Sequence, residues 1–286
     1  MDARLKNVGV SLVVVLGIFA LAMFVLAPLG NMFSTEVGNG SLNLNFEVEE
    51  STLGKRFLFV VIGLLIAFVI YYMTKENDAW EVGTRQVVWM AIGAALYAVF
   101  SWLFNASVFV VPSASQVALR PAIAIPMFFG YAFGPVVGFF SGAVGNMFGD
   151  ALTGFGLSPQ WSIGNGLIGF ISGCWMLFRD RKQSMNTVLY ISGALVVLTA
   201  LLFFMNRNTP NMLFFDVENG VFGDATISLF AGISIVVGFI LVLAVRYGFA
   251  SNENVATAVM WGMLGNFLGL LFASLSDIYI NGFPCR

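Results

Sequence analysis

The sequence consists of long apolar runs separated by short polar segments. About 20 apolar residues are needed for a helix to cross the hydrocarbon core of a bilayer. We place candidate spans at residues 8–29, 57–73, 86–104, 119–133, 135–153, 161–178, 187–205, 226–245 and 255–274. Because helices and closed barrels alone satisfy the backbone hydrogen bonds inside lipid, this pattern predicts an all-α, polytopic membrane helix bundle of about nine spans. The span at 119–133 is short, and Pro121 and Pro126 are expected to kink it.

Composition supports this class and excludes several others. Hydrophobic residues make up 59% of the chain and charged residues 10%, whereas soluble domains carry about 25% charged residues. The net charge of −2 gives no basis for binding nucleic acid. The sequence has no histidine, which excludes His-ligated metal sites and a His general base. It also lacks the G-x-x-x-x-G-K-[ST] motif of ATP-hydrolysing P-loops. No metal or cofactor is predicted, and Cys174 and Cys285 indicate no disulfide framework.

The basic residues predict an orientation in the membrane. Cytoplasmic loops carry an excess of Lys and Arg. With the N-terminus in the cytoplasm, the inner side receives Arg4, Lys6, Lys75, Arg85, Arg179, Arg181, Lys182 and Arg246. The outer side receives Lys55, Arg56, Arg120, Arg207 and Arg286, together with the acidic loop 30–56. The run at 8–29 is too long for a signal-peptide core, and we expect it to be a retained helix.

The same pattern suggests four parts of the chain. Residues 1–74 form an N-terminal transmembrane hairpin with its acidic outer loop, and 75–85 form a charged cytoplasmic linker. Residues 86–250 form a membrane core, and 251–286 form a C-terminal helix and tail.

Glycines dominate the predicted helix at 135–153. They lie three or four residues apart, at Gly134, Gly138, Gly142, Gly145 and Gly149. At about 100° per residue they share one face, and small residues at such spacing let helix backbones approach closely. The glycines therefore predict tight helix packing. A formal G-x-G-x-x-G match at 164–169 has no preceding strand and is not read as a dinucleotide site.

A polar face runs beside these glycines. Asn146, Asp150 and Thr153 are spaced i, i+4 and i+7, so they line one side of the helix. A carboxylate inside an apolar span is a functional candidate by default, although an ion pair between Asp150 and Arg120, or a position in the water layer, is an open alternative. Trp161 and Asn165 repeat the i, i+4 spacing on the next helix, where Trp161 would also suit an interfacial anchor.

In the predicted orientation these polar groups gather at one depth, near the outer side. The candidate ligand-binding residues are Arg120, Asn146, Asp150, Trp161 and Asn165, and Asn105 and Gln116 flank the neighbouring outer loop. An aromatic ring, a cation, a carboxylate and amides are the polar anchors expected of a ligand pocket in an apolar wall. The arrangement predicts a pocket that is open to the exterior.

Small residues also recur on the predicted helix at 86–104. Ala91 and Ala95 form one small-xxx-small pair, and Ala94 and Ala98 form another. Either pair could serve internal helix packing or dock a partner membrane protein.

Several segments together resemble one known family. These are Arg120-Pro121, Phe133-Gly134-Pro135, the glycine-rich helix that ends at Gly149-Asp150, the segment Pro159 to Gly173 with Asn165-Gly166 and Gly169, and Ala91-x-x-x-Ala95. They are similar to the substrate-binding S component of energy-coupling factor (ECF) transporters, the vitamin importers of prokaryotes. The resemblance covers about residues 86–250 and is closest over 119–173.

The resemblance implies a six-helix S-component-like core in the plasma membrane of a prokaryote. Both termini of this core would lie in the cytoplasm. It implies that a small vitamin-like substrate binds near the outer face, and that Ala91 and Ala95 dock on a membrane T component that carries two ATPase subunits. The N-terminal hairpin and the apolar run at 255–274 are additions to this pattern.

We therefore expect a substrate-capture subunit and not an enzyme. One alternative is a ligand-sensing or scaffold membrane module without transport. Another is a membrane enzyme, which would need Asp150 with a second acid such as Asp224 or Asp277.

Overall fold

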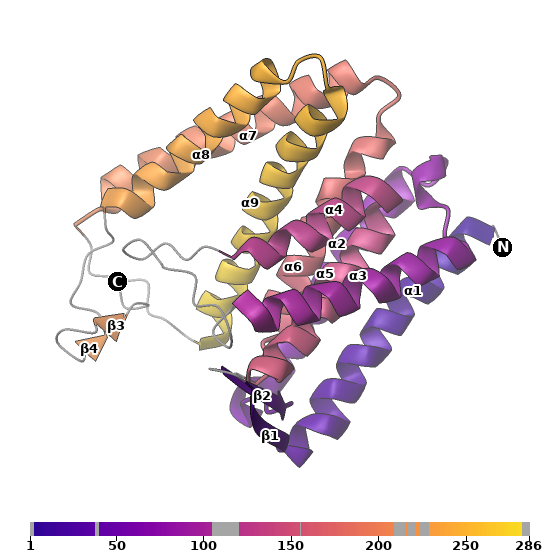
Figure 1. Ribbon diagram of the computed structural model, residues 1–286, viewed down its shortest axis with the longest axis vertical. Helices are drawn as coiled ribbons and strands as arrows, with labels where there is room; N and C mark the ends of the chain where they lie inside the picture. Colours follow the sequence, from indigo (N-terminus) through magenta and orange to yellow (C-terminus); the bar gives the residue numbers. More distant parts are fainter. Residues whose placement is uncertain are drawn as a thin grey trace.

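The chain folds into a bundle of helices (Figure 1). The computed structural model describes residues 3–37, 40–104, 120–154, 156–208, 215–216, 221–222 and 229–281. The helices in this part are α1 (Ala3–Leu21), α2 (Leu53–Met73), α3 (Thr84–Trp102), α4 (Ala124–Phe133), α5 (Pro135–Thr153), α6 (Pro159–Gly173), α7 (Arg181–Asn206), α8 (Leu229–Gly248) and α9 (Glu253–Asn281). Each predicted apolar run coincides with one of them, so the helical pattern is confirmed. The expected kink appears as a 3₁₀ turn, Pro121–Ile123, before α4.

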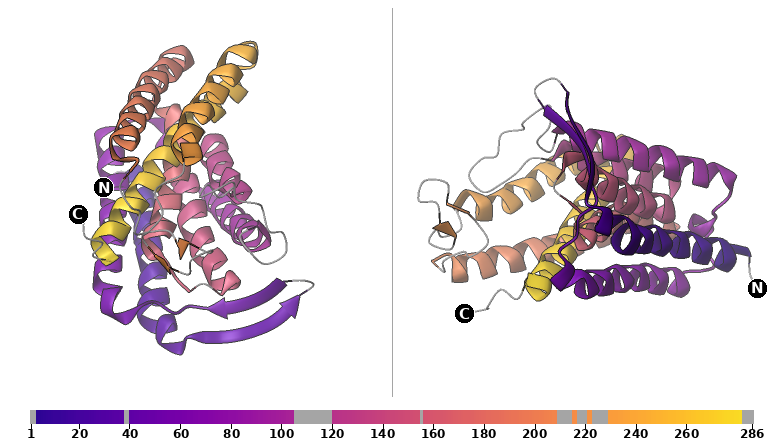
Figure 2. Two further views of the ribbon diagram at one scale, coloured as in Figure 1. Left: turned by 90° about the vertical axis from the view of Figure 1, so that its left-hand side faces the viewer. Right: turned by 90° about the horizontal axis from the view of Figure 1, so that it is seen from below.

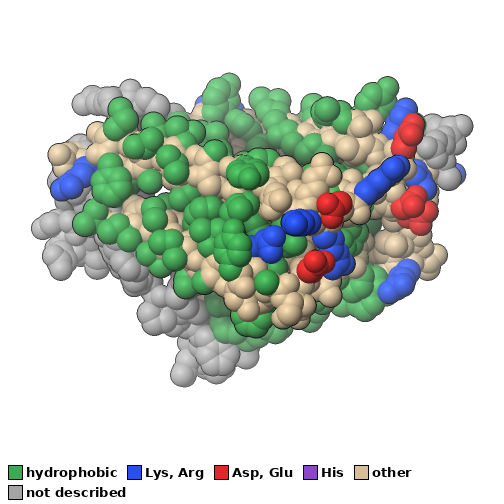
Figure 3. Space-filling model, turned by 90° about the horizontal axis from the view of Figure 1, so that it is seen from above, with side chains coloured by type: hydrophobic (Ala, Val, Ile, Leu, Met, Phe, Trp, Pro, Cys, Tyr) green, Lys and Arg blue, Asp and Glu red, His purple; other side chains and the backbone are tan. Residues whose placement is uncertain are grey.

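The apolar surface of the bundle fits a membrane protein. Four helical segments of the described chain are long and apolar enough to cross a bilayer: Arg4–Leu29, Glu50–Met73, Arg181–Asn206 and Glu253–Asn281. Figure 3 shows a face that is covered largely by hydrophobic side chains, with most charged side chains in its right half. Such a surface is favourable in lipid, where apolar side chains need no burial in the protein.

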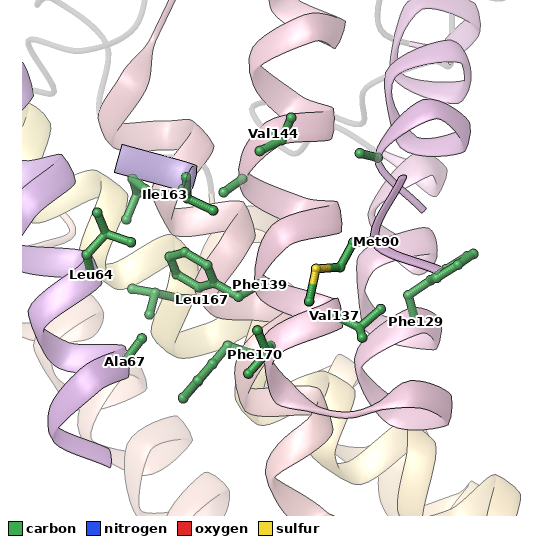
Figure 4. Packing of buried hydrophobic residues seen from close by; sticks show 14 of the residues in the cluster. Leu64, Ala67, Met90, Phe129, Val137, Phe139, Val144, Ile163, Leu167 and Phe170 are labelled. Atoms are coloured by element: carbon green, nitrogen blue, oxygen red, sulfur yellow. The ribbon is translucent and has the colours of Figure 1, made fainter. Parts of the chain in front are cut away.

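Helices α5 and α6 form the centre of the bundle. They pack against each other, α3 and α4 flank α5, and α2 and α9 flank α6. The buried side chains between them come from several helices, as Figure 4 shows for Leu64, Met90, Phe129, Phe139 and Ile163. The core therefore joins the N-terminal hairpin to the central helices.

The glycines of α5 permit two close helix contacts. A Cβ atom on Gly142 would lie 2.2 Å from the carbonyl oxygen of Asn165 on α6, and one on Gly138 would lie 2.2 Å from that of Gly169. A Cβ on Gly145 or Gly149 would instead meet α3, at Ala94 or Ser101. The predicted tight packing is present, and the single glycine face serves two neighbours because α3 and α6 both contact α5.

Gly134 makes the sharp reversal between α4 and α5. Its φ angle is 107°, a conformation that side-chain-bearing residues rarely adopt. Its N–H donates to the carbonyl oxygen of Gly130 at the end of α4. Pro135 then occupies the first turn of α5, where a missing N–H costs nothing.

The acidic loop contains a β-hairpin that the sequence pattern did not predict. Strands β1 (Asn31–Val37) and β2 (Gly40–Asn45) pair antiparallel, with Ser34 opposite Asn43. The indole N–H of Trp102 donates to the carbonyl oxygen of Ser41 over 2.9 Å, and the Asn45 amide donates to that of Gly154 over 3.3 Å. The hairpin is thus fixed to the ends of α3 and α5. A second short pair, β3 (Phe215–Asp216) and β4 (Val221–Phe222), precedes α8.

Helix α9 packs directly on the central helices. It contacts α6 and α4, and a Cβ on Gly269 would lie 2.4 Å from the carbonyl oxygen of Gly164. Helices α7 and α8 pack on each other and on α9, and they extend to one side of the bundle (Figures 1 and 2). Although residues 255–274 were expected as an addition to a six-helix core, their helix shares a close interface with it. The domain limits at 74, 85 and 250 stay predictions.

Candidate functional site

Asn146 of α5 is the centre of a buried polar cluster. Its amide nitrogen donates to Asp150 Oδ2 over 2.9 Å and to Ser162 Oγ over 3.1 Å. Its amide oxygen accepts from Asn165 over 2.7 Å and from the Tyr97 hydroxyl over 3.4 Å. Asn146 and Asn165 are both buried, with 3% and 6% of their surfaces exposed. The structure therefore brings Asn146, Asp150 and Asn165 together, as the sequence predicts.

A cavity of about 140 Å³ lies beside this cluster. Three predicted site residues line it: Arg120, Trp161 and Asn165. Its remaining wall comes from Tyr97, Ala122, Ile123, Asn266 and Leu270. Ligand pockets usually measure about 300–1,000 Å³, so the described walls enclose the space for a small ligand or for part of a larger one.

Arg120 supplies the positive charge of this cavity. It is exposed, and it directly precedes the 3₁₀ turn Pro121–Ile123. No salt bridge joins Arg120 to Asp150, or to any other carboxylate of the described residues. Arg120 and Asp150 therefore form no direct salt bridge, which was one alternative for Asp150.

Asp150 and Thr153 do not line the cavity. Asp150 accepts the hydrogen bond from Asn146, which in turn holds Asn165 at the cavity wall. The Thr153 hydroxyl donates to the carbonyl oxygens of Gly149 and Asp150 in its own helix. Asp150 is thus linked by hydrogen bonds to the cavity wall through Asn146 and Asn165.

Trp161 is held inside the protein by its indole N–H. This group donates to Asp277 Oδ2 of α9 over 2.5 Å, and the ring is half-buried at the cavity. A Trp that served as an interfacial anchor would direct its N–H to the headgroup region. The bond to Asp277 therefore favours a place for Trp161 in the binding wall.

Sequence reasoning missed Tyr97 and Asn266. Tyr97 lies on the Ala94–Ala98 side of α3, which is buried against α5. Asn266 interrupts the apolar run of α9, and a polar residue within an apolar span is the signal that would have found it. Asn105 and Gln116, which the sequence placed beside the pocket, lie outside the described residues, as do Asp224 and Cys285.

The two alanine pairs of α3 have different surroundings. Ala94 and Ala98 are buried, whereas Ala91 and Ala95 are exposed. A Cβ on Gly145 of α5 would lie 2.8 Å from the carbonyl oxygen of Ala94, so this pair serves internal packing. The exposed pair leaves a small-residue surface on the outside of the bundle.

Other chemistry finds little support in the described residues. They contain no group of three or more Cys, Asp or Glu side chains that could hold a metal ion. A larger cavity of about 240 Å³ lies between α1 and α2, but its walls are apolar and include Leu12, Leu64 and Phe68. Of these two cavities, the one at Arg120 is the better candidate for binding a polar solute.

Comparisons with known proteins find similarity over part of the chain. Residues 81–206 match the family described as "ECF-type riboflavin transporter, S component". A UPF0397 protein of Vibrio atlanticus is 36% identical over 100 residues, which cover 35% of this chain and 53% of that protein. UPF0397 proteins of Aliivibrio fischeri and Aliivibrio salmonicida are 30% identical over 126 residues and 32% over 102.

These alignments cover part of each protein. The chain spans 53%, 66% and 54% of the length of these three relatives. No solved structure matches the chain. The matched segment runs from just before α3 to the end of α7, and it contains Arg120, Asn146, Asp150, Trp161 and Asn165. Residues 81–206 of this multi-pass membrane protein are therefore similar to the S component of ECF-type riboflavin transporters.

Proposed function

We propose that this protein is the substrate-capture subunit of an ATP-driven, ECF-type importer in a prokaryotic plasma membrane. The observation that carries the proposal is the cavity at Arg120, most of whose lining lies within the matched segment. It combines a cation that forms no salt bridge with a described carboxylate, an aromatic ring and the buried amide of Asn165. A small, polar, vitamin-like nutrient has the matching chemistry, because it offers carbonyl or anionic groups, hydrogen-bonding edges and a flat ring.

The direction of access follows from the charges at the two ends of the bundle. Arg4 pairs with Asp78 over 2.5 Å, and the Asn77 amide donates to the carbonyl oxygen of Leu177, so three predicted inner segments meet at one end. Trp161 lies in the first turn of α6 and lines the same cavity as Arg120. Just before α6, the Leu157 N–H donates to the carbonyl oxygen of Glu47, which follows β2. Since Lys and Arg concentrate on the cytoplasmic side, this arrangement supports a cytoplasmic N-terminus and a cavity that opens to the exterior.

Each cavity residue has a role that its chemistry suggests. Arg120 binds an anionic or carbonyl group, Trp161 stacks on a ring, and Asn165 donates or accepts a hydrogen bond. Asn146 orients Asn165 through their mutual bond. Asp150, which we expected to bind a cationic or hydroxyl group of the substrate, acts through its bond to Asn146.

Ala91 and Ala95 are the proposed docking surface for partner proteins. They are exposed on α3, and small side chains let a second helix approach closely without a driving force from water. The partners would be a membrane T component and two ATPase subunits, since the chain has no P-loop of its own. Transport would follow docking of the loaded subunit.

The first test is to identify the bound small molecule. The full-length protein is purified in mild detergent and denatured, and the released compounds are analysed by mass spectrometry. Riboflavin, which the family description names, is then added as the first probe and followed by quenching of its fluorescence. We expect a vitamin-like compound in the wild type and a loss of it in Arg120→Gln and Asp150→Ala.

A matched control is Arg207→Gln, which removes an exposed Arg at the end of α7 that does not line the cavity. It should retain the compound. Well-folded wild-type protein that carries no compound and binds no vitamin of a broad panel would contradict substrate capture and favour a scaffold module.

A further inference from the structure

Trp161 is the end of a chain of polar contacts that crosses three helices. Asp277 of α9 accepts from the Trp161 indole through Oδ2 over 2.5 Å and from the Gln160 amide through Oδ1 over 2.7 Å. Gln160 accepts in turn from the Arg56 guanidinium of α2 over 3.1 Å. Arg56 also lies 3.6 Å from a carboxylate oxygen of Glu49.

Gln160 and Arg56, at the middle of this chain, are shielded from water. Gln160 is 1% exposed, and the side chain of Arg56 is 11% exposed. Hydrogen bonds to a charged group in such surroundings are strong, and a buried partner that loses its bond is costly. The contacts therefore restrain the side chains that make them.

The dipole of its own helix does not explain why a carboxylate stands at position 277. It lies in the last turn of α9, where the helix dipole disfavours a negative charge. It also lies beside Gln160 and Trp161, in the first turn of α6, where the dipole of that helix favours one. The position of the carboxylate is thus explained by its interaction with α6.

The order of donors and acceptors fixes the geometry. Arg56 can only donate, so it holds the oxygen of the Gln160 amide toward itself and turns the nitrogen toward Asp277. Trp161 can only donate through its indole. Asp277 meets the two donors with two separate oxygen atoms, which a carboxylate has and an amide does not.

We propose that Asp277 is a positioning residue that fixes the Trp161 ring at the wall of the substrate cavity, with Arg56 and Gln160 holding the carboxylate in place. This inference rests on the proposed function of the cavity. It gives the N-terminal hairpin and the C-terminal helix, both outside the matched family segment, a direct part in the binding site. With its N–H bonded to Asp277, Trp161 has only its ring left to interact with a ligand.

The test exchanges the carboxylate of Asp277 and the amide of Gln160 between the two positions. In Asp277→Asn, an amide nitrogen replaces one of the two carboxylate oxygens and faces a donor, so either Gln160 or Trp161 loses its bond in the present geometry. In Gln160→Glu, two carboxylates face each other. In the double variant, Glu at 160 accepts from Arg56 and from the Asn at 277, whose oxygen accepts from Trp161. The double variant therefore restores every contact without changing the net charge.

The readout is independent of ligand. Full-length protein labelled with 5-fluorotryptophan gives ¹⁹F resonances for its 6 Trp residues, and Trp161→Phe assigns the one of interest. We expect Asp277→Asn and Gln160→Glu to shift or broaden the Trp161 resonance, and the double variant to return it to the wild-type position. Ser276→Ala is the matched control: its hydroxyl bonds only within α9, to the carbonyl oxygen of Phe272, and its loss should leave Trp161 unchanged.

Binding of riboflavin, or of the compound released from the wild type, is measured on the same proteins. Each single variant should weaken binding by about tenfold, the effect of one lost hydrogen bond to a charged group, and the double variant should recover it. Two results would overturn the positioning role. In one, the Trp161 resonance does not move in Asp277→Asn; in the other, it moves equally in the single and double variants. Normal resonance behaviour without binding of any ligand instead contradicts the proposed function alone.

Discussion

The close contact between α5 and α6 gives a sharp test of the bundle. In Gly142→Ala, the new Cβ would lie 2.2 Å from the carbonyl oxygen of Asn165, 2.6 Å from its carbon and 2.9 Å from the Cα of Gly166. Ordinary contact begins at 3.4 Å, so the helices must separate locally by about 1.2 Å. The atoms in the way belong to the backbone, so no side chain can rotate to make room.

Two opposing effects set the magnitude. Replacing Gly by Ala within a helix contributes up to about 1 kcal/mol of stability. Overpacking a well-packed interior costs about 1–3 kcal/mol, and contacts with backbone belong at the upper end of that range. We therefore expect a net loss of about 1–2 kcal/mol. Because the displaced carbonyl belongs to Asn165, the change should also weaken ligand binding.

The assay is thermal unfolding in detergent. The measured quantity is the fraction of protein that stays monodisperse after heating. Gly17→Ala in α1 is the matched control, because no atom lies within 4 Å of its added Cβ. It should be as stable as the wild type or more so. If Gly142→Ala melts at the same temperature as Gly17→Ala, the close α5–α6 contact is refuted.

Three further changes separate buried from exposed interactions. Asn146→Leu removes the centre of the polar cluster and leaves its partners unsatisfied, so the same melting assay should show a loss of about 1–3 kcal/mol or more, and a smaller effect would contradict a tightly bonded cluster. Trp80→Phe removes the hydrogen bonds of a fully buried indole N–H to the carbonyl and hydroxyl oxygens of Thr74 and should cost about 1–3 kcal/mol of stability. An unchanged melting temperature would mean that water replaces these hydrogen bonds. Arg4→Gln breaks an exposed pair with Asp78 and should change stability by less than about 1 kcal/mol, a difference that high salt should reduce further.

The sequence alone determined the class of the protein and the approximate position of each long helix that the structure describes. Lipid forces the backbone to bond within each segment, so a span is encoded locally by its run of apolar residues. The site residues Asn146, Asp150, Trp161 and Asn165 were also recognisable, because a polar group in such a run is costly and stands out. Helical spacing placed Asn146 beside Asp150, and their hydrogen bond of 2.9 Å follows from that spacing.

Only the tertiary structure decided which helices share the site. Asn266 and Asp277 of α9 lie more than a hundred residues from Asn165 and Trp161, yet they meet them at the cavity and at its supporting contacts. The hairpin β1–β2 was likewise hidden, since its polar residues are fixed by bonds to α3 and α5. In lipid the outward faces of different helices are almost equally apolar, so the periodicity of one helix does not name its neighbour. That choice depends on where glycines and polar side chains of distant segments fit one another in three dimensions.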